Sequence, residues 1–382
     1  MKTRLALITE IIAPYRIPVF NALANSEDVE LHVIFLAEND ASLRQWLVYK
    51  DEIQFSYQVL PSWRGALGNQ NALFNWGVAR ALSAARPDIV ICGGYNYPAS
   101  WRAAYWAKHR RIPFLLWIES TSLDRRTMHF FVEKLKLHFL DLCTGFVVPG
   151  RASTEYLRRL GVSEDRIFVA PNAIDIHLFQ DAAARARQEA GRLREALRLP
   201  ARYFLDVGRL VEAKGAFDLI DAYAKLNAAL RAEVSLLFLG DGVAREALAA
   251  RSRAILPGSI EFRGFIQRDA LPAFYALAEA LVFPTHSDTW GFVVNEAMAC
   301  GTPVIVSEVA VCVPDLVQNF ETGILVPSQD AASIAESLAF LAERPGTGVE
   351  MARRATKLIS QYSPAAWAAG IASAVASMGG HR

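Results

Sequence analysis

The chain has 382 residues, of which 53% are hydrophobic, and a formal net charge of +1. This length exceeds one ordinary hydrophobic core, so we expect two globular domains of comparable size. The charge is balanced, and no aromatic and basic RNA-binding signature is present. These features argue against a dedicated nucleic-acid binder.

The four cysteines lie far apart and form no Cys-x-x-Cys pair. This spacing argues against a zinc site or a disulfide framework and fits a reducing cytoplasm. No stretch reaches the roughly 18 uninterrupted apolar residues that a membrane span requires. The apolar run after Lys2 and Arg4 is interrupted by Thr9 and Glu10, so we interpret it as a first strand and not as a signal peptide.

The first half of the chain alternates short β-rich runs with amphipathic helical stretches. This alternation predicts βαβ units and a parallel sheet. The expected strands are Arg4–Ile8, Leu31–Leu36, Asp88–Cys92, Phe114–Ile118 and Phe146–Pro149.

The second half repeats the same alternation, so we expect an α/β protein with two Rossmann-like domains facing each other across a cleft. The domains are placed at residues 1–175 and 201–362, with a linker at 176–200 that contains a solvated helix. An Ala-rich helix at 363–378 is a candidate to pack back onto the first domain. The expected strands are Tyr203–Val207, Ser235–Leu239, Ser259–Phe262, Leu281–Pro284, Val304–Ser307 and Ile324–Val326.

The loop after the first strand of the second domain carries two cations, Arg209 and Lys214, between Gly208 and Gly215. Ligands bind such sheets at the carboxyl ends of the strands. An arginine fork and a lysine point charge there suit a diphosphate and can neutralise a leaving group. The alternative is an ordinary loop with two solvated cations, because short motifs also occur by chance.

A second loop places two carboxylates, Asp288 and Glu296, eight positions apart around Gly291. Gly291 falls where a strand passes into a helix, and the free N–H groups of a helix N-terminus attract phosphate or sugar hydroxyls. The alternative is that Asp288 caps the helix and that Glu296 is a solvated helix residue.

Two further turns follow strands of the second domain. Gly240-Asp241-Gly242 lacks the third glycine of the dinucleotide fingerprint, since Arg245 stands in its place, and is weak evidence for NAD. The backbone of Gly264, Phe265 and Ile266 is suited to bonding a base edge, although a tight turn explains the same residues.

In combination these motifs resemble the family 4 retaining glycosyltransferases of the GT-B fold. The resemblance covers residues 200–345 closely and the first domain more loosely. It is carried by Val207–Leu210 with Lys214-Gly215, Leu239–Gly242, Phe262–Phe265, Gly291–Ile305, Pro14–Pro18 and Pro171–Asp175.

The resemblance implies that Arg209 and Lys214 hold the diphosphate of a nucleotide-sugar and that Glu296 holds its ribose. Asp288 would meet the hydroxyls of the transferred sugar. Further substrate contacts are expected from Gly208, Gly264, Phe265, Ile266, Gly291, Phe292 and Val293.

The chain departs from the family pattern in three places. Asp288 stands where the family has a glutamate, one methylene longer, which affects donor-sugar preference. Glu119 takes the position of a histidine that often follows the fifth strand, and a carboxylate donates a hydrogen bond only when protonated. Glu119 is therefore either a site residue that accepts a hydrogen bond or assists a developing positive charge, or a structural glutamate paired with an arginine. A glycine pair is not evident around Ile11–Tyr15.

We therefore expect a cytoplasmic, metal-independent, retaining glycosyltransferase. It would move a hexose from a nucleotide diphosphate sugar, UDP- or GDP-linked, to a glycan or lipid-linked glycan in polysaccharide biosynthesis. The chain has no Asp-x-Asp, and its seven histidines show no ligand spacing, so we expect no metal and no cofactor beyond the co-substrate. The alternatives are a nucleotide-sugar epimerase and a non-catalytic nucleotide-sugar-binding protein.

The segment Thr127–Leu142 combines aromatic and aliphatic residues with Lys134, Lys136 and His138. One interpretation is an amphipathic helix that contacts the inner face of the membrane or a lipid-linked acceptor. We favour the other, a core helix, because a helix packed on a sheet needs such an apolar face.

Overall fold

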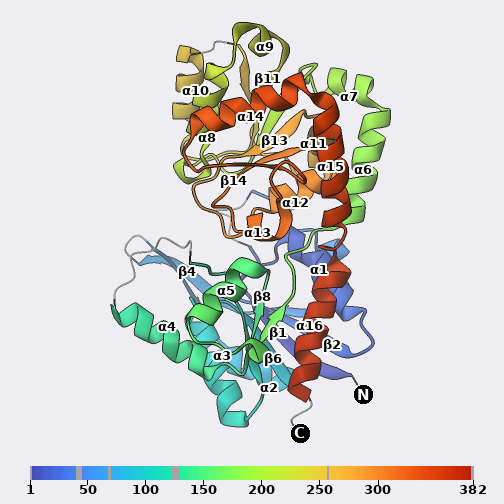
Figure 1. Ribbon diagram of the computed structural model, residues 1–382. Coiled ribbons are helices and arrows are strands. Elements are labelled where there is room, and N and C mark those ends of the chain that lie inside the picture. Colours follow the sequence, from blue (N-terminus) through green and yellow to red (C-terminus); the bar gives the residue numbers. More distant parts are fainter. Residues whose placement is uncertain (1, 40–44, 68–69, 123–129, 256–257, 380–382) are drawn as a thin grey trace. The chain divides into compact units, whose positions relative to one another are not determined.

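The computed structural model describes residues 2–39, 45–67, 70–122, 130–255 and 258–379. The chain divides into two compact units, Met1–Ala173 with Pro364–Arg382, and Ile174–Ser363 (Figure 1). Both are built on parallel sheets with helices on their faces, so the expected pair of Rossmann-like domains is confirmed. Within the described ranges, no helix is both long and apolar enough to cross a bilayer.

In the first unit, the described residues form a seven-stranded parallel sheet in the order β3-β2-β1-β6-β7-β8-β9. The strands are β1 (Thr3–Thr9), β2 (Val29–Phe35), β3 (Ser56–Val59), β6 (Ile89–Gly93), β7 (Phe114–Trp117), β8 (Gly145–Val148) and β9 (Ile167–Val169). The helices are α1 (Ile17–Ala24), α2 (Val78–Ala85), α3 (Pro98–Arg110), α4 (Phe130–Leu142), α5 (Arg151–Arg159) and α16 (Pro364–Gly379).

Four strands of this unit were not expected from the sequence. β3 and β9 are edge strands of only four and three residues, and such short runs give no clear strand pattern in a sequence. β4 (Ser62–Leu67) and β5 (Gln70–Asn75) form a separate antiparallel hairpin. Its Trp63 and Phe74 rings pair across the strands at 6.0 Å.

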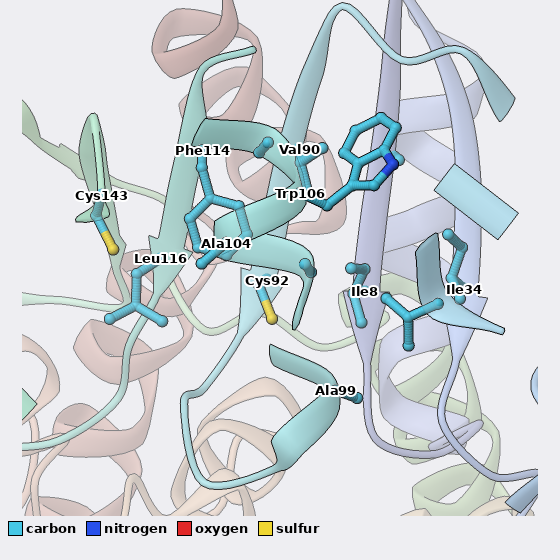
Figure 2. Close-up of a cluster of buried hydrophobic side chains, with 14 of the residues drawn as sticks. Ile8, Ile34, Val90, Cys92, Ala99, Ala104, Trp106, Phe114, Leu116 and Cys143 are labelled. Atoms are coloured by element: carbon cyan, nitrogen blue, oxygen red, sulfur yellow. The ribbon is translucent and has the colours of Figure 1, made fainter. Parts of the chain in front are cut away.

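The sheet of the first unit buries apolar side chains on both faces, as a parallel sheet does. Figure 2 shows one face, where Ile8, Val90 and Leu116 of the strands lie with residues of α3. Ala99 and Ala104 are small enough to let α3 approach the sheet closely. The two faces together explain why the strand sequences are almost continuously apolar.

The other face is covered by α1 and by α16, the last helix of the chain, which lie side by side (Figure 1). Trp367 of α16 is fully buried. Its ring lies 5.6 Å from that of Phe20 in α1 and 5.5 Å from that of Trp117 in β7. The C-terminal segment is therefore part of the core of the first unit.

In the second unit, the described residues form a six-stranded parallel sheet in the order β12-β11-β10-β13-β14-β15. The strands are β10 (Tyr203–Val207), β11 (Ser235–Leu239), β12 (Ile260–Phe262), β13 (Ala280–Phe283), β14 (Val304–Ser307) and β15 (Ile324–Val326). The helices are α6 (Ile176–Gln188), α7 (Ala190–Ala196), α8 (Ala216–Lys225), α9 (Ala228–Glu233), α10 (Arg245–Ile255), α11 (Leu271–Ala276), α12 (Phe292–Ala299), α13 (Val313–Leu316), α14 (Ala331–Glu343) and α15 (Pro345–Ile359).

Residues 176–200, which the sequence suggested as a linker, form α6 and α7 and belong to the second unit. α6 packs against α11 and α12. Asp175 caps α6 by accepting a hydrogen bond from the N–H of Leu178 at 3.1 Å. Arg187 of α6 donates to the carbonyl oxygen of Gly301 at 3.1 Å, so this segment is anchored beside α12.

The packing of α16 generates a prediction about two glycines of that helix. A Cβ added at Gly370 would lie 2.3 Å from the carbonyl oxygen of Val169, whereas one added at Gly379 meets nothing within 4 Å. Gly370→Ala should therefore destabilise the first unit by about 1–3 kcal/mol. Gly379→Ala, the matched control, should be neutral or slightly stabilising, since alanine favours helix.

Urea unfolding followed by tryptophan fluorescence measures this difference. The signal reports mainly on the first unit, because Trp290 is the only tryptophan of the second. Equal stability of the two variants would contradict the described contact between α16 and β9.

Candidate active site

The cationic loop and the acidic loop leave the sheet of the second unit from neighbouring strands. β10 and β13 pair in parallel, with Phe204 opposite Ala280 and Leu205 opposite Leu281. Their carboxyl ends therefore meet at one edge of the sheet, where ligands of such sheets bind. The structure thus brings the loop of Arg209 and Lys214 next to the loop of Asp288.

Hydrogen bonds join these two loops. The carbonyl oxygen of Ala213 accepts from the N–H of His286 at 2.9 Å and from the Thr285 hydroxyl at 3.2 Å. Gly215 has φ +72°, and a Cβ there would lie 2.0 Å from the carbonyl oxygen of Pro284. Only glycine permits this approach, so its place in the motif has a steric cause.

Lys214 contacts the acidic loop through its ammonium group. Its ammonium donates to the carbonyl oxygen of Ser287 at 3.0 Å and pairs with Oδ2 of Asp288. Arg209, in contrast, is exposed on the same loop. Of the two predicted cations, Lys214 is thus paired with the predicted acid Asp288, whereas Arg209 is exposed to solvent.

The helix start after the acidic loop is formed by Gly291, which has φ +107° and is the N-cap of α12. Asp288 does not cap this helix: its Oδ1 accepts from the N–H of Trp290 at 3.0 Å, inside the loop. The alternative interpretation of Asp288 as a helix cap is therefore wrong. The first turn of α12, with Phe292 and Val293, presents the N–H groups that a helix cannot bond internally.

Glu296 lies on α12 and is partly buried, not fully solvated. Burial raises the pKa of this carboxyl to about 7, although the hydrogen bond from Tyr275 lowers it. The Tyr275 hydroxyl donates to Oε2 of Glu296 at 2.7 Å. Tyr275 was missed by the sequence analysis because nothing in the apolar segment of α11 marks it as a partner of Glu296.

Another acid, Asp206, is buried and was also missed. It lies in β10, where burial raises its pKa to about 7 and the nearby positive charge of Lys214 lowers it. The sequence did contain a signal, since Asp206 is a charged residue within the otherwise apolar run Tyr203–Val207. Strongly shifted acids cluster at functional sites, and two of them lie at this end of the second unit.

The turns after β10, β11 and β12 contact one another closely at their glycines. The N–H of Gly240 donates to the carbonyl oxygen of Gly264 at 2.7 Å. A Cβ on Gly240 would lie 1.8 Å from the carbonyl oxygen of Gly208. The structure therefore brings Gly208 and Gly264 together, followed by Phe265, which is 39% exposed, and the partly buried Ile266.

Glu119 belongs to the first unit, whereas the other predicted site residues belong to the second. Its Oε1 accepts from the Arg16 guanidinium at 2.5 Å. Arg16 also donates to Asn172 Oδ1 at 3.0 Å and lies 4.2 Å from the centre of the Trp117 ring. This contact matches the alternative interpretation, in which Glu119 is a glutamate paired with an arginine. The Glu119 side chain is nevertheless 28% exposed.

The helix expected within Thr127–Leu142 is α4. Phe139 and Leu140 are buried in the core, whereas Leu135 and Leu137 are 53% and 43% exposed. Residues 127–129 and the side chains of Phe130 and Phe131 lie outside the described residues. In the described part of the chain, no group of three or more His, Cys, Asp or Glu side chains is arranged to hold a metal.

The burial of Asp206 generates a prediction about pH. An unperturbed aspartic acid titrates at 3.8, and the folded value is about 7. Between these values the folded protein holds a proton that the unfolded chain releases, so Asp206 lowers stability as the pH rises, by up to about 4 kcal/mol. Asp206→Asn removes this titration, and its stability relative to the wild type should increase between pH 5 and pH 8.

Thermal unfolding of both proteins at the two pH values measures this change. Glu155→Gln is the control, because Glu155 is exposed and pairs with Arg159 one turn along α5. If the stability difference between Asp206→Asn and the wild type stays constant with pH, then burial does not raise the pKa of Asp206.

Comparison with known proteins identifies the family. The family model "Glycosyltransferase Family 4" matches residues 20–178, and "Glycosyl transferases group 1" matches residues 189–373. The D-inositol 3-phosphate glycosyltransferase of Streptomyces bingchenggensis is 32% identical over 201 residues, which cover 50% of this chain and 43% of the relative. An uncharacterized glycosyltransferase of Methanocaldococcus jannaschii is 27% identical over 266 residues, 66% of each chain. The chain spans about half the length of the inositol-phosphate relatives that it matches.

Solved structures of low sequence identity share the fold. Anabaena HepE, in complex with UDP and glucose, superposes with a TM-score of 0.76 at 18% identity, over 98% of this chain and 100% of that one. Sucrose-phosphate synthase from Thermosynechococcus elongatus superposes with a TM-score of 0.75 at 19% identity, over 100% of both chains. The chain therefore belongs to the family 4 glycosyltransferases and has the GT-B fold.

Proposed function

We propose that this protein is a retaining hexosyltransferase that works without a metal ion. Its donor is a nucleotide diphosphate sugar, UDP- or GDP-linked, and its acceptor is a glycan or a lipid-linked glycan. The observation that carries the proposal is the joining of the Arg209–Lys214 loop to the loop before Gly291 at one edge of the sheet. Anabaena HepE, which has the same fold, has been solved with UDP and glucose, which supports a nucleotide-sugar donor here.

Each part of the donor has a matching group in the second unit. The exposed guanidinium of Arg209 and the ammonium of Lys214 suit the diphosphate, together with the N-terminus of α12 at Gly291. Glu296, fixed by Tyr275, suits the ribose hydroxyls. The remaining contacts are the turn Gly264, Phe265 and Ile266 for the base, and the backbone of Gly291, Phe292 and Val293 for the sugar.

In the proposed reaction, the bond between the anomeric carbon and the diphosphate oxygen breaks on the same face on which the bond to the acceptor oxygen forms. The departing phosphate takes the proton of the acceptor hydroxyl. Arg209 and Lys214 stabilise the negative charge that develops on the leaving group. In the first unit, we assign Glu119 to a hydrogen bond with the acceptor, with Arg16 holding its carboxylate in place.

The proposed location is the cytoplasm. All four cysteines are unpaired and buried, which suits a reducing compartment. For a lipid-linked acceptor, the exposed Leu135 and Leu137 of α4, next to the exposed Lys134, are the residues that we assign to peripheral membrane contact.

The donor is tested by thermal unfolding with UDP, GDP, ADP, TDP and their sugars. A ligand at a hundred times its dissociation constant stabilises the folded state by about 2.7 kcal/mol. We expect one nucleotide class to stabilise the second unit and its sugar to be transferred with retained anomeric configuration. An epimerase would instead isomerise the donor without an acceptor, and a binding protein would be stabilised without any turnover.

Arg209→Ala tests whether Arg209 stabilises the departing nucleoside diphosphate. Loss of one charge-stabilising donor costs about 100- to 1000-fold in turnover in comparable sites, so we expect kcat/KM to fall by roughly 100-fold or more. Arg253→Ala, which removes another exposed arginine of the same unit on α10, should leave kcat/KM unchanged. An Arg209→Ala variant with wild-type turnover would exclude the diphosphate role of this residue.

A further inference from the structure

Asp288 makes two contacts, one through each carboxylate oxygen. Oδ1 accepts from the N–H of Trp290 at 3.0 Å, and Oδ2 pairs with the Lys214 ammonium. Both charged side chains are mostly buried, with exposures of 18% for Lys214 and 19% for Asp288. The carboxylate is thus turned toward the lysine and the loop backbone, although the resemblance assigns it to the hydroxyls of the sugar.

The contacts of Lys214 explain what this pairing does. An ammonium has three N–H donors, and here two of them are directed to Ser287 and Asp288. The two acceptors fix the position of the ammonium and leave one donor for a ligand. At the same time, the negative charge of Asp288 partly offsets the positive charge of Lys214, so the ammonium attracts an incoming diphosphate less strongly than an unpaired lysine would.

Resting on the function proposed above, we propose that Asp288 is the counter-ion of Lys214 and that, through this pairing, it weakens the binding of the donor diphosphate. The shorter side chain of aspartate suits this role, because it keeps the carboxylate within the loop that it stabilises. Arg209, which is exposed, then supplies the uncompensated positive charge of the site.

A carboxylate next to the diphosphate weakens its binding by Coulomb repulsion and by competing for the ammonium. For unit charges about 6 Å apart, the effect on affinity is roughly threefold at the dielectric constant of water and roughly a hundredfold at the effective value of about 20 near a protein surface. Asp288→Asn removes the charge but keeps an oxygen that accepts from Trp290. The variant should therefore bind a nucleoside diphosphate at least roughly threefold more tightly than the wild type.

Calorimetric titration with UDP, GDP, ADP and TDP tests this proposal, because these nucleotides carry the diphosphate without the sugar. We expect Asp288→Asn to bind the nucleotide more tightly than the wild type. Asp288→Glu, which restores the charge, should return the affinity for the nucleotide toward the wild-type value. Unchanged or weaker binding of the nucleotide by Asp288→Asn would overturn the proposal.

A double-mutant cycle with Lys214→Gln tests whether the effect passes through the lysine. Without the lysine, Asp288→Asn should give a much smaller gain, whereas an equal gain in both backgrounds would contradict the pairing. Thermal unfolding without ligand verifies that each variant is folded. If no nucleotide binds the folded wild type, the proposed function itself fails; if the wild type binds and Asp288→Asn does not bind more tightly, only the role of Asp288 fails.

Discussion

The attachment of Lys214 to the loop after β13 is the contact on which the candidate site depends. It joins the ends of two neighbouring strands through Ser287 and Asp288. The close approach of Gly215 to Pro284 makes the junction possible. Because these bonds belong to the folded protein, the lysine is oriented before a ligand arrives, and such preorganisation is what makes charge stabilisation effective in catalysis.

The same end of the sheet contains acids in an apolar environment. Burial raises the pKa of both Asp206 and Glu296 to about 7, so each lowers stability when it ionises at neutral pH. Hydrophobic residues would avoid this loss. Acids whose pKa values are raised at a cost in stability are typical of functional sites.

The sequence predicted the parts of the structure that depend on local pattern. Apolar runs located the strands of the second unit, such as Val304–Ser307, because a strand buried on both faces is apolar throughout. The role of Tyr275 was not predictable, because its contact with Glu296 joins residues of α11 and α12 that share no motif. The pairing of Asp288 with Lys214 was also missed, because a motif lists residues and does not say which side chains turn toward one another.

The most direct test of the account is a crystal structure of the protein with its nucleotide-sugar. We predict that the diphosphate lies at the carboxyl ends of β10 and β13, within hydrogen-bonding distance of Arg209 and Lys214, and that the ribose contacts Glu296. A nucleotide bound elsewhere on the chain, with these side chains untouched, would contradict the central claim.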